Sequence, residues 1–293
     1  MEILTHSRIK TRKNCPMAEH IRYDLELAPI NKRQSLNIGS AAHLGLETDD
    51  IDKAVDYFKD VLPSDQDEAN SLEVTRATVK AMLTGYFNRF GVWPEGTLKE
   101  KQFEIPIINP ATGAKSKSFT LHGKIDAITY IDGQAWIVEY KTASQINQGY
   151  FERLELDDQI TTYMYAVKKA FDIDAVGVIY RVLKKPSIRQ TKKESLQQFC
   201  NRLDQDYVDR PEFYFYEAKF YRSSEDLKRF EKELWAFTKQ YLYERKNDIH
   251  CKNASRCLDW GRCEYMPICL QSPDWELFYE KKQKHEELQE ESV

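Results

Sequence analysis

No stretch of this sequence is apolar for long enough to cross a membrane. A spanning helix needs about 20 consecutive apolar residues, and the 41% hydrophobic residues are spread in short groups. The first ten residues, MEILTHSRIK, also lack the apolar core of a signal peptide. We therefore expect a cytoplasmic protein without a membrane partner. With 11 glycines and 10 prolines in 293 residues, the chain is neither collagen-like nor of low complexity.

An excess of one charge is also lacking. The 43 basic and 47 acidic side chains give a net charge of -4, which argues against a globally basic DNA-binding protein. The charges are nevertheless unevenly placed. Residues 181–193 hold six Lys or Arg and no acid, whereas the last eight residues hold four Glu and no base. The basic block is either a solvated loop or a local phosphate-binding surface.

Closely spaced cysteine pairs are absent, although four of the six cysteines fall between residues 251 and 269. In a reducing compartment, clustered thiols bind metal more often than they form disulfides. The Cys-x₂₋₄-Cys spacing of zinc knuckles does not occur here. A zinc site therefore stays open only as an alternative, and its ligands would be Cys251, Cys257, Cys263 and Cys269. The chain also has neither an internal repeat nor the Gly-Lys-Ser/Thr loop of a helicase.

Helical periodicity dominates the first hundred residues, with helices expected from Pro16 (Ile21 and Leu25 on one face), from about Asn37, and over 67–90. This mixture of helices with later strands predicts an α/β fold, a sheet flanked by helices. We expect one domain over 1–279, with a helical part (1–98), a core (99–245), a cysteine cluster (251–270) and a charged, disordered tail (280–293). The further elements expected are strands at 103–107, 119–131, 134–142, 175–183 and 212–221, and helices at 156–171, 194–207 and 224–243.

Asp132-Gly133 is a strong signal for a two-residue hairpin turn. With that turn, Asp126 lies opposite Glu139, and Lys141 shares their face of the sheet. Two adjacent carboxylates repel each other, and a divalent cation such as Mg²⁺ or Mn²⁺ removes the conflict. The alternative is a solvent-exposed hairpin in which Lys141 simply balances Glu139.

Two further pairs stand four residues apart, Gly39 with His43 and Gln159 with Tyr163. In this order, the Gly-x-x-x-His pair, Asp126, Glu139-Tyr140-Lys141 and the Gln-x-x-x-Tyr pair resemble the motifs of the PD-(D/E)XK nuclease superfamily, in its RecB-like branch. The resemblance implies a restriction-endonuclease-like mixed sheet flanked by helices.

The cysteines resemble the iron–sulfur members of that branch. Cys15-Pro16 resembles their first ligand, and Cys257, Cys263 and Cys269 resemble the other three. The gap of five residues before Cys263 is two in many members, so Cys251 is the alternative ligand. The resemblance implies a [4Fe-4S] cluster that staples the N-terminal helix to the C-terminal segment.

The resemblance also implies a Mg²⁺- or Mn²⁺-dependent deoxyribonuclease, an exonuclease on DNA ends in recombination, repair or phage and mobile-element DNA processing. A second copy of the chain or a recombination protein is the candidate partner. The alternative is a non-catalytic DNA-binding or scaffold module with a structural metal cluster. The metal ligands that the resemblance implies are His43, Asp126, Glu139 and the Tyr140 carbonyl. Lys141 would act on the attacking water, and Gln159 and Tyr163 would position the substrate or the lysine. The residues that would contact phosphates are Arg181, Lys184 and Lys185.

Overall fold

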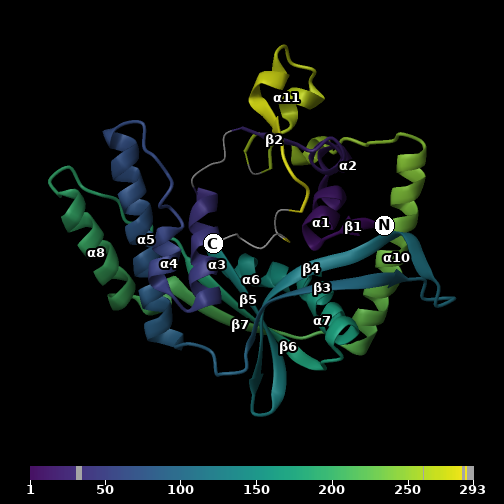
Figure 1. Cartoon of the computed structure of the whole chain (residues 1–293), viewed down its shortest axis with the longest axis horizontal. Helices are drawn as coiled ribbons and strands as arrows, with labels where there is room; N and C mark the ends of the chain where they lie inside the picture. Colours follow the sequence, from purple (N-terminus) through teal and green to yellow (C-terminus); the bar gives the residue numbers. More distant parts are fainter. Residues whose placement is uncertain (31–34, 260, 286–287, 289–293) are drawn as a thin grey trace.

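The computed structural model describes residues 1–30, 35–259, 261–285 and 288 (Figure 1). The strands are β1 (Glu2–Leu4), β2 (Leu27–Pro29), β3 (Leu98–Ile108), β4 (Lys115–Ile131), β5 (Gln134–Ala143), β6 (Ala175–Lys184), β7 (Phe215–Phe220) and β8 (Tyr279–Lys281). The α-helices are α1 (His6–Asn14), α2 (Pro16–Glu19), α3 (Ser35–Thr48), α4 (Ile51–Asp56), α5 (Gln66–Phe90), α6 (Gln148–Leu154), α7 (Asp158–Phe171), α8 (Leu196–Asp209), α9 (Pro211–Tyr214), α10 (Ser224–Lys246) and α11 (Met266–Cys269). A π-helix, η1 (His20–Asp24), continues α2, and the 3-10 helices η2 (Ala254–Arg256) and η3 (Trp275–Phe278) lie in the C-terminal segment.

Six strands form one mixed sheet around the long β4. β5 pairs antiparallel with β4 and parallel with β6, and β7 pairs antiparallel with β6. β3 runs antiparallel to β4, and β1 pairs parallel with residues 119–121 of β4. β3 occupies one edge of β4 along the residues that pair with β1 and also along residues that pair with β5. The strands β1 and β5 therefore share the opposite edge of β4. β2 and β8 form a separate antiparallel pair.

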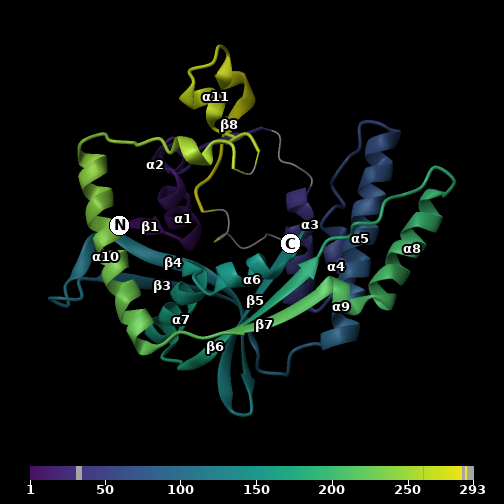
Figure 2. The same ribbon diagram turned by 180° about the vertical axis from the view of Figure 1, so that it is seen from behind.

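Helices cover both faces of this sheet (Figures 1 and 2). α3, α4, α5 and α8 enclose a core that includes Met82 and, from β5, Val138. α7 and α10 enclose the other core, which includes Leu234 and, from β5, Ile137. Neighbouring strand residues point to opposite faces, so the buried pair Ile137-Val138 joins the two cores. The predicted α/β sheet flanked by helices is confirmed.

The hairpin between β4 and β5 has the predicted register for five residue pairs, from Ile131–Gln134 to Ala127–Val138. Asp132 and Gly133 both have positive φ, 51° and 75°, as the favoured type of two-residue hairpin turn requires. The backbone ladder stops at Ala127. The strands therefore separate just where the predicted site begins.

The N-terminal helix α1 is held by buried ion pairs as well as by the apolar contact of Ile9. Arg8 is fully buried and donates to Glu19 Oε1 at 2.7 Å and to the Tyr241 hydroxyl on α10 at 2.5 Å. Arg12 pairs with the same Glu19 carboxylate at 2.8 Å and also with Glu244. Both oxygens of this buried carboxylate thus have charged donors, which burial requires. The network joins α1 and α2 to α10.

Three predictions of secondary structure were wrong in detail. Residues 212–214, predicted as strand, lie in the short helix α9, because Pro211 starts a helical turn. The helix predicted over 156–171 starts at Asp158, because Asp157 caps it, and α6 is a separate helix. Leu25 was expected beside the buried Ile21 but is 39% exposed, because the wider turn of the π-helix rotates later residues away from an α-helical position.

Residues 280 and 281, predicted as the start of a disordered tail, lie in a strand. Residues 279–281 form β8, which pairs with β2, and the Lys281 ammonium donates to the Leu25 carbonyl. Residues 286–287 and 289–293 of the predicted tail lie outside the described residues. Among the described helices, none has both the length and the apolar character that crossing a bilayer requires.

Candidate active site

The candidate site lies where β4 loses its neighbours on one edge. On that edge β1 pairs with residues 119–121 and β5 with residues 127–131, so no described strand lies beside residues 122–126. A pocket of about 420 Å³ opens there. Residues of α1, α3, β3, β4, β5 and α7, together with Thr5 before α1, line it. Polar side chains thus line the pocket at the point where the strand pairing of β4 is interrupted.

Asp126, Glu139 and Lys141 all line this pocket. The Lys141 ammonium donates to Glu139 Oε1, and the two side chains share a face because they stand two residues apart. Asp126 Oδ2 accepts the N–H of Tyr140 at 2.8 Å, so a side chain replaces the missing ladder bond. The structure therefore brings the three predicted side chains together on one side of the sheet, beyond the last backbone pair of the hairpin.

Burial governs the protonation of these groups. Burial first, and then the charge of Asp126, raises the pKa of Glu139 to about 7. Burial alone would raise the pKa of Asp126, but His43, Lys141 and the Tyr140 N–H outweigh it and lower that pKa. Burial opposes the charge of Lys141, yet the two carboxylates raise its pKa. At neutral pH the pocket holds one firmly ionised acid, one acid near its titration point and one cation.

Helix α3 brings His43 to the same pocket. It passes close to β5 at Gly39, where a Cβ atom would lie only 3.3 Å from Thr142 Oγ1. One turn later, His43 Nδ1 lies 3.6 Å from Asp126 Oδ1. Burial lowers the pKa of His43, but Asp126 raises it more, and the net shift is upward. A side chain at position 39 would therefore crowd Thr142 in the helix that presents His43.

The oxygen donors of this pocket fit a hard divalent cation. Glu139 Oε2 is buried and has no hydrogen-bond partner among the described residues, a costly state for a carboxylate oxygen. Asp126 presents a second carboxylate in the same pocket, and such oxygens are the ligands of Mg²⁺ and Mn²⁺. The Tyr140 hydroxyl accepts a bond from Trp93 Nε1 at 2.5 Å. Of the two oxygens of Tyr140, the main-chain carbonyl and not the hydroxyl is therefore the candidate ligand.

Helix α7 supplies the remaining polar wall. Gln159 Nε2 donates to Glu139 Oε1 at 2.8 Å and lies 2.9 Å from the Tyr163 hydroxyl. Asp157 Oδ1 accepts the Gln159 N–H at 2.7 Å and fixes the first turn of the helix. Gln159 thus orients the Glu139 carboxylate, and Tyr163 orients Gln159. This is a concrete role for the predicted pair within the protein.

The prediction that Arg181 contacts phosphates was wrong. Arg181 is 7% exposed and lies between the rings of Phe90 and Trp93, at 4.2 and 4.1 Å. Its guanidinium donates to the Tyr86 hydroxyl at 2.7 Å and to Glu217 at 2.8 Å. The side chain is therefore part of the core beneath α5 and unavailable to a ligand.

Lys184 and Lys185 lie nearer the surface, at the end of β6. Lys184 is paired in the sheet with Ala143, two residues after Lys141, and its ammonium lies 3.6 Å from the centre of the Phe213 ring. Burial lowers the pKa of Lys185. Both stay candidates for contact with a substrate that leaves the pocket along the end of β5.

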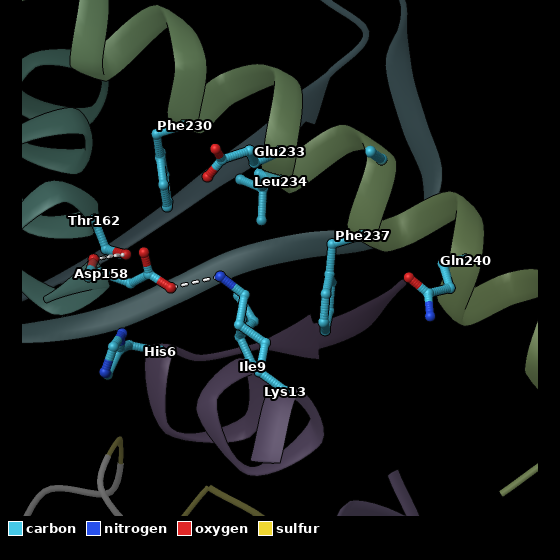
Figure 3. A pocket seen from close by; sticks show the side chains of 11 residues that line it. His6, Ile9, Lys13, Asp158, Thr162, Phe230, Glu233, Leu234, Phe237 and Gln240 are labelled. Carbon is cyan, nitrogen blue, oxygen red and sulfur yellow. Dashed lines mark hydrogen bonds and ion pairs between the residues drawn. The ribbon is translucent and has the colours of Figure 1, made fainter. Parts of the chain in front are cut away.

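His6 is a residue that the sequence did not single out. It lines both the candidate site and a neighbouring cavity of about 330 Å³, which an ion pair between Lys13 and Asp158 crosses (Figure 3). Its Nε2 is buried without a partner among the described residues, and burial lowers its pKa to about 4. His6 owes its position to the three-residue strand β1, which is too short to leave a pattern in the sequence.

Cys15, Cys257, Cys263 and Cys269 lie near one another. Cys15 stands at the junction of α1 and α2. Burial raises the pKa of Cys263 and of Cys269, and the thiols of Cys15 and Cys257 raise both further. Cys251 is exposed, unlike these two thiols.

The spacing of the thiols bears on the choice between zinc and a cluster. Four sulfur ligands 2.3 Å from one tetrahedral zinc lie about 3.8 Å apart. In the described part of the chain, no three cysteines have sulfurs within 4.8 Å of one another. An iron–sulfur cluster binds each thiolate to a different iron and holds them farther apart. The four thiols are therefore not gathered as the ligands of one zinc ion would be.

Comparison with known proteins agrees with this fold. The profile of the PD-(D/E)XK nuclease superfamily matches residues 3–270. The chain belongs to the PD-(D/E)XK nuclease superfamily, and its mixed sheet flanked by helices is the restriction-endonuclease-like fold of that superfamily. The resemblance found in the sequence is thereby confirmed for the superfamily.

One solved structure similar to this chain is a presumed exonuclease from Eubacterium rectale. It has a TM-score of 0.52 and 10% identity, over 92% of this chain and 88% of that chain. At this identity the likeness shows a shared fold alone. Another, the protein SSO0001, has 15% identity over 90% of this chain and 94% of its own, but its TM-score of 0.31 carries no argument. No curated protein sequence matches the chain.

Proposed function

We propose that this protein is a Mg²⁺- or Mn²⁺-dependent deoxyribonuclease that degrades DNA from its ends. The observation that carries the proposal is one pocket that holds Asp126, Glu139 and Lys141. In this pocket Glu139 Oε2 is buried and has no hydrogen-bond partner among the described residues. A purely structural hairpin has no reason to bury two neighbouring acids. Membership of the nuclease superfamily supports the same conclusion.

The metal ion would be held by Asp126, Glu139, His43 and the Tyr140 carbonyl. When bound, such an ion lowers the pKa of a water ligand and stabilises charge on a phosphate. Lys141 is held at the pocket by Glu139. From there its ammonium hydrogen-bonds an attacking water or neutralises charge that develops on the phosphate.

Gln159 and Tyr163 act through Glu139 in this proposal, because Gln159 Nε2 donates to that carboxylate. Lys184 and Lys185 contact the DNA backbone at the end of β5. Phosphate contacts of this kind give affinity without sequence preference and make binding sensitive to salt. Recombination, repair or the processing of phage and mobile-element DNA is the setting that we propose.

Digestion of end-labelled linear DNA tests the proposal. We expect single- or double-stranded substrate to be degraded from the labelled end with Mg²⁺ or Mn²⁺ and to be stable in EDTA. Asp126→Asn should abolish degradation, whereas the exposed Lys168→Ala, which pairs with Asp172 and Asp174 on the surface, should not. Binding of DNA without metal-dependent cleavage would support the non-catalytic module instead, and cleavage of circular DNA would contradict the exonuclease.

We also propose a [4Fe-4S] cluster on Cys15, Cys257, Cys263 and Cys269. Burial of Cys263 and Cys269 and their proximity to Cys15 and Cys257 support this choice of ligands over Cys251. Protein purified without oxygen should be brown and contain about four irons per chain. Cys257→Ser should lose the iron, and Cys251→Ser should keep it. Colourless protein with zinc and no iron would contradict the cluster without touching the nuclease.

A further inference from the structure

A second cluster of potential metal ligands lies away from both the pocket and the cysteines. His20 and Asp24 stand at the two ends of the π-helix η1, and His250 comes from the segment after α10. One ligand atom of each lies within 4.8 Å of those of the other two. Their side chains are 22%, 16% and 12% exposed. From this geometry we infer that His20, Asp24 and His250 form a binding site for a divalent transition-metal ion of the Zn²⁺ type.

The hydrogen bonds of His250 leave one ring nitrogen ready for a metal. Its Nε2 lies 3.2 Å from the Asp248 carboxylate. Its Nδ1 is buried and has no partner among the described residues. When one nitrogen of an imidazole donates to a carboxylate, the lone pair lies on the other nitrogen. A carboxylate in this position is the usual outer partner of a zinc-bound histidine. Asp248 thus prepares His250 as a ligand through Nδ1.

Asp24 is prepared in the same way. Its Oδ1 accepts from Arg8 Nη2 at 3.2 Å, so the carboxylate is held in place by a buried cation. Its Oδ2 lies 3.0 Å from His20 Nδ1. Two ligands about 2.1 Å from one tetrahedral zinc are about 3.4 Å apart. The His20–Asp24 pair already has nearly that spacing, and no other pair needs to close by more than about 1.4 Å.

The two histidine rings are stacked, with centroids 3.6 Å apart and an angle of 21° between the planes. Binding would fan these rings open around the ion. Two imidazoles and one carboxylate suit zinc and its neighbours in the periodic table, and they leave a fourth position for water. A π-helical turn, which is frequent at functional sites, is what carries both His20 and Asp24.

The ion would join two segments that are far apart in the sequence. Main-chain contact already exists beside the site, since the Met17 N–H donates to the Cys251 carbonyl at 3.1 Å. In both views the chain that leaves α10 runs past α2 (Figures 1 and 2). A ligand set drawn from both segments would stabilise their contact independently of the four cysteines.

Titration of the full-length protein with Co²⁺, after treatment with EDTA, tests the site. We expect visible absorption bands of cobalt with nitrogen and oxygen ligands, without the intense near-ultraviolet band of cobalt–thiolate bonds. Zn²⁺ should displace the cobalt and raise the melting temperature. His20→Asn and His250→Asn should each weaken binding by more than about 100-fold, and Asp248→Asn, at a side chain that is 95% exposed, by about 10–100-fold.

Matched controls separate this site from the others. His285→Asn removes a histidine that packs on Tyr23 near η1, and Asp126→Asn removes a carboxylate of the nuclease pocket. His285→Asn should bind Co²⁺ as the wild type does, and Asp126→Asn should lose at most the ion of the nuclease pocket and keep the one held by His20, Asp24 and His250. Unchanged binding in His20→Asn and His250→Asn, or a spectrum dominated by thiolate bands, would overturn the inference and leave His20–Asp24 as an ordinary ion pair. Equal melting temperatures without metal would show that these variants fold.

Discussion

Arg181 occupies a buried position, although its place in a basic block of the sequence predicted a position on the surface. As part of a basic block it was expected on a DNA-binding surface, yet it lies beneath α5 between two aromatic rings. We predict that Arg181→Met destabilises the fold and leaves the salt dependence of DNA binding unchanged. Methionine keeps most of the apolar contact of the arginine stem but removes the charge and its donors.

The size of the effect follows from the contacts that are lost. The buried hydrogen bond to Tyr86 involves a charged donor and contributes about 1.5–3 kcal/mol. The pair with Glu217, whose side chain is 33% exposed, adds at most about 1 kcal/mol. Stacking on Phe90 and Trp93 adds about 1 kcal/mol beyond what methionine recovers. The free energy of unfolding should fall by about 3 kcal/mol.

Urea unfolding followed by tryptophan fluorescence measures this loss, and DNA binding at several salt concentrations measures the other half. The matched control is Lys184→Met, which should change stability by less than about 1 kcal/mol. The same control should lower the slope of log affinity against log salt by about 0.7–0.9, the share of one phosphate contact. If Arg181→Met unfolds like the wild type and loses that slope instead, the structural role is refuted.

Three further outcomes are expected. In EDTA, the pKa of Glu139 is raised to about 7 from an ordinary 4.5, so between these pH values the folded state holds a proton that the unfolded state has lost. The free energy of unfolding should therefore fall as the pH rises from about 4.5 to 7. Urea unfolding at pH 5 and pH 8 measures this fall, which should be smaller in Glu139→Gln. Gly39→Val should push α3 away from β5 and lower nuclease activity at least about 10-fold. Adding Thr142→Ala should restore part of the activity, and the control Gly149→Ala should have little effect. Equal rates in the single and the double variant would contradict this contact. Arg8→Met removes one partner of the buried Glu19 carboxylate and should cost about 3–5 kcal/mol in urea unfolding, whereas a loss below about 1 kcal/mol would contradict the role of the network.

The acid-bearing face could be predicted because its cause is local. Asp132-Gly133 forms a two-residue turn, and that turn alone sets which residues of β4 and β5 share a face. What the turn could not predict is the end of the ladder at Ala127. Farther along, the same edge of β4 pairs with β1, a strand from the N-terminus that no local pattern near the turn reports.

The roles of the basic residues were harder to predict, because charge in a sequence does not report burial. Arg181 lies within the buried strand segment 178–183, where it alternates with Tyr180 and Val182. That apolar context was the available signal. The aromatic residues that enclose the guanidinium come from α5 and the loop after it, so only the tertiary fold brings them together.

The N-terminal helix shows the same limit more strongly. α1 buries Arg8 and Arg12, which its own sequence would place in water. Their partners Glu19 and Tyr241 lie on other elements, one of them more than two hundred residues away. No period or spacing within the helix encodes such a network. The site formed by His20, Asp24 and His250 is beyond local prediction for the same reason.

The most direct test of the proposed nuclease site is the rate at which Lys141→Ala digests end-labelled linear DNA in Mg²⁺, with Mn²⁺ binding measured in the same preparation. We predict that digestion falls by at least about 100-fold while Mn²⁺ still binds through Asp126 and Glu139. A variant that digests DNA at the wild-type rate would contradict the assignment of this pocket as the nuclease site.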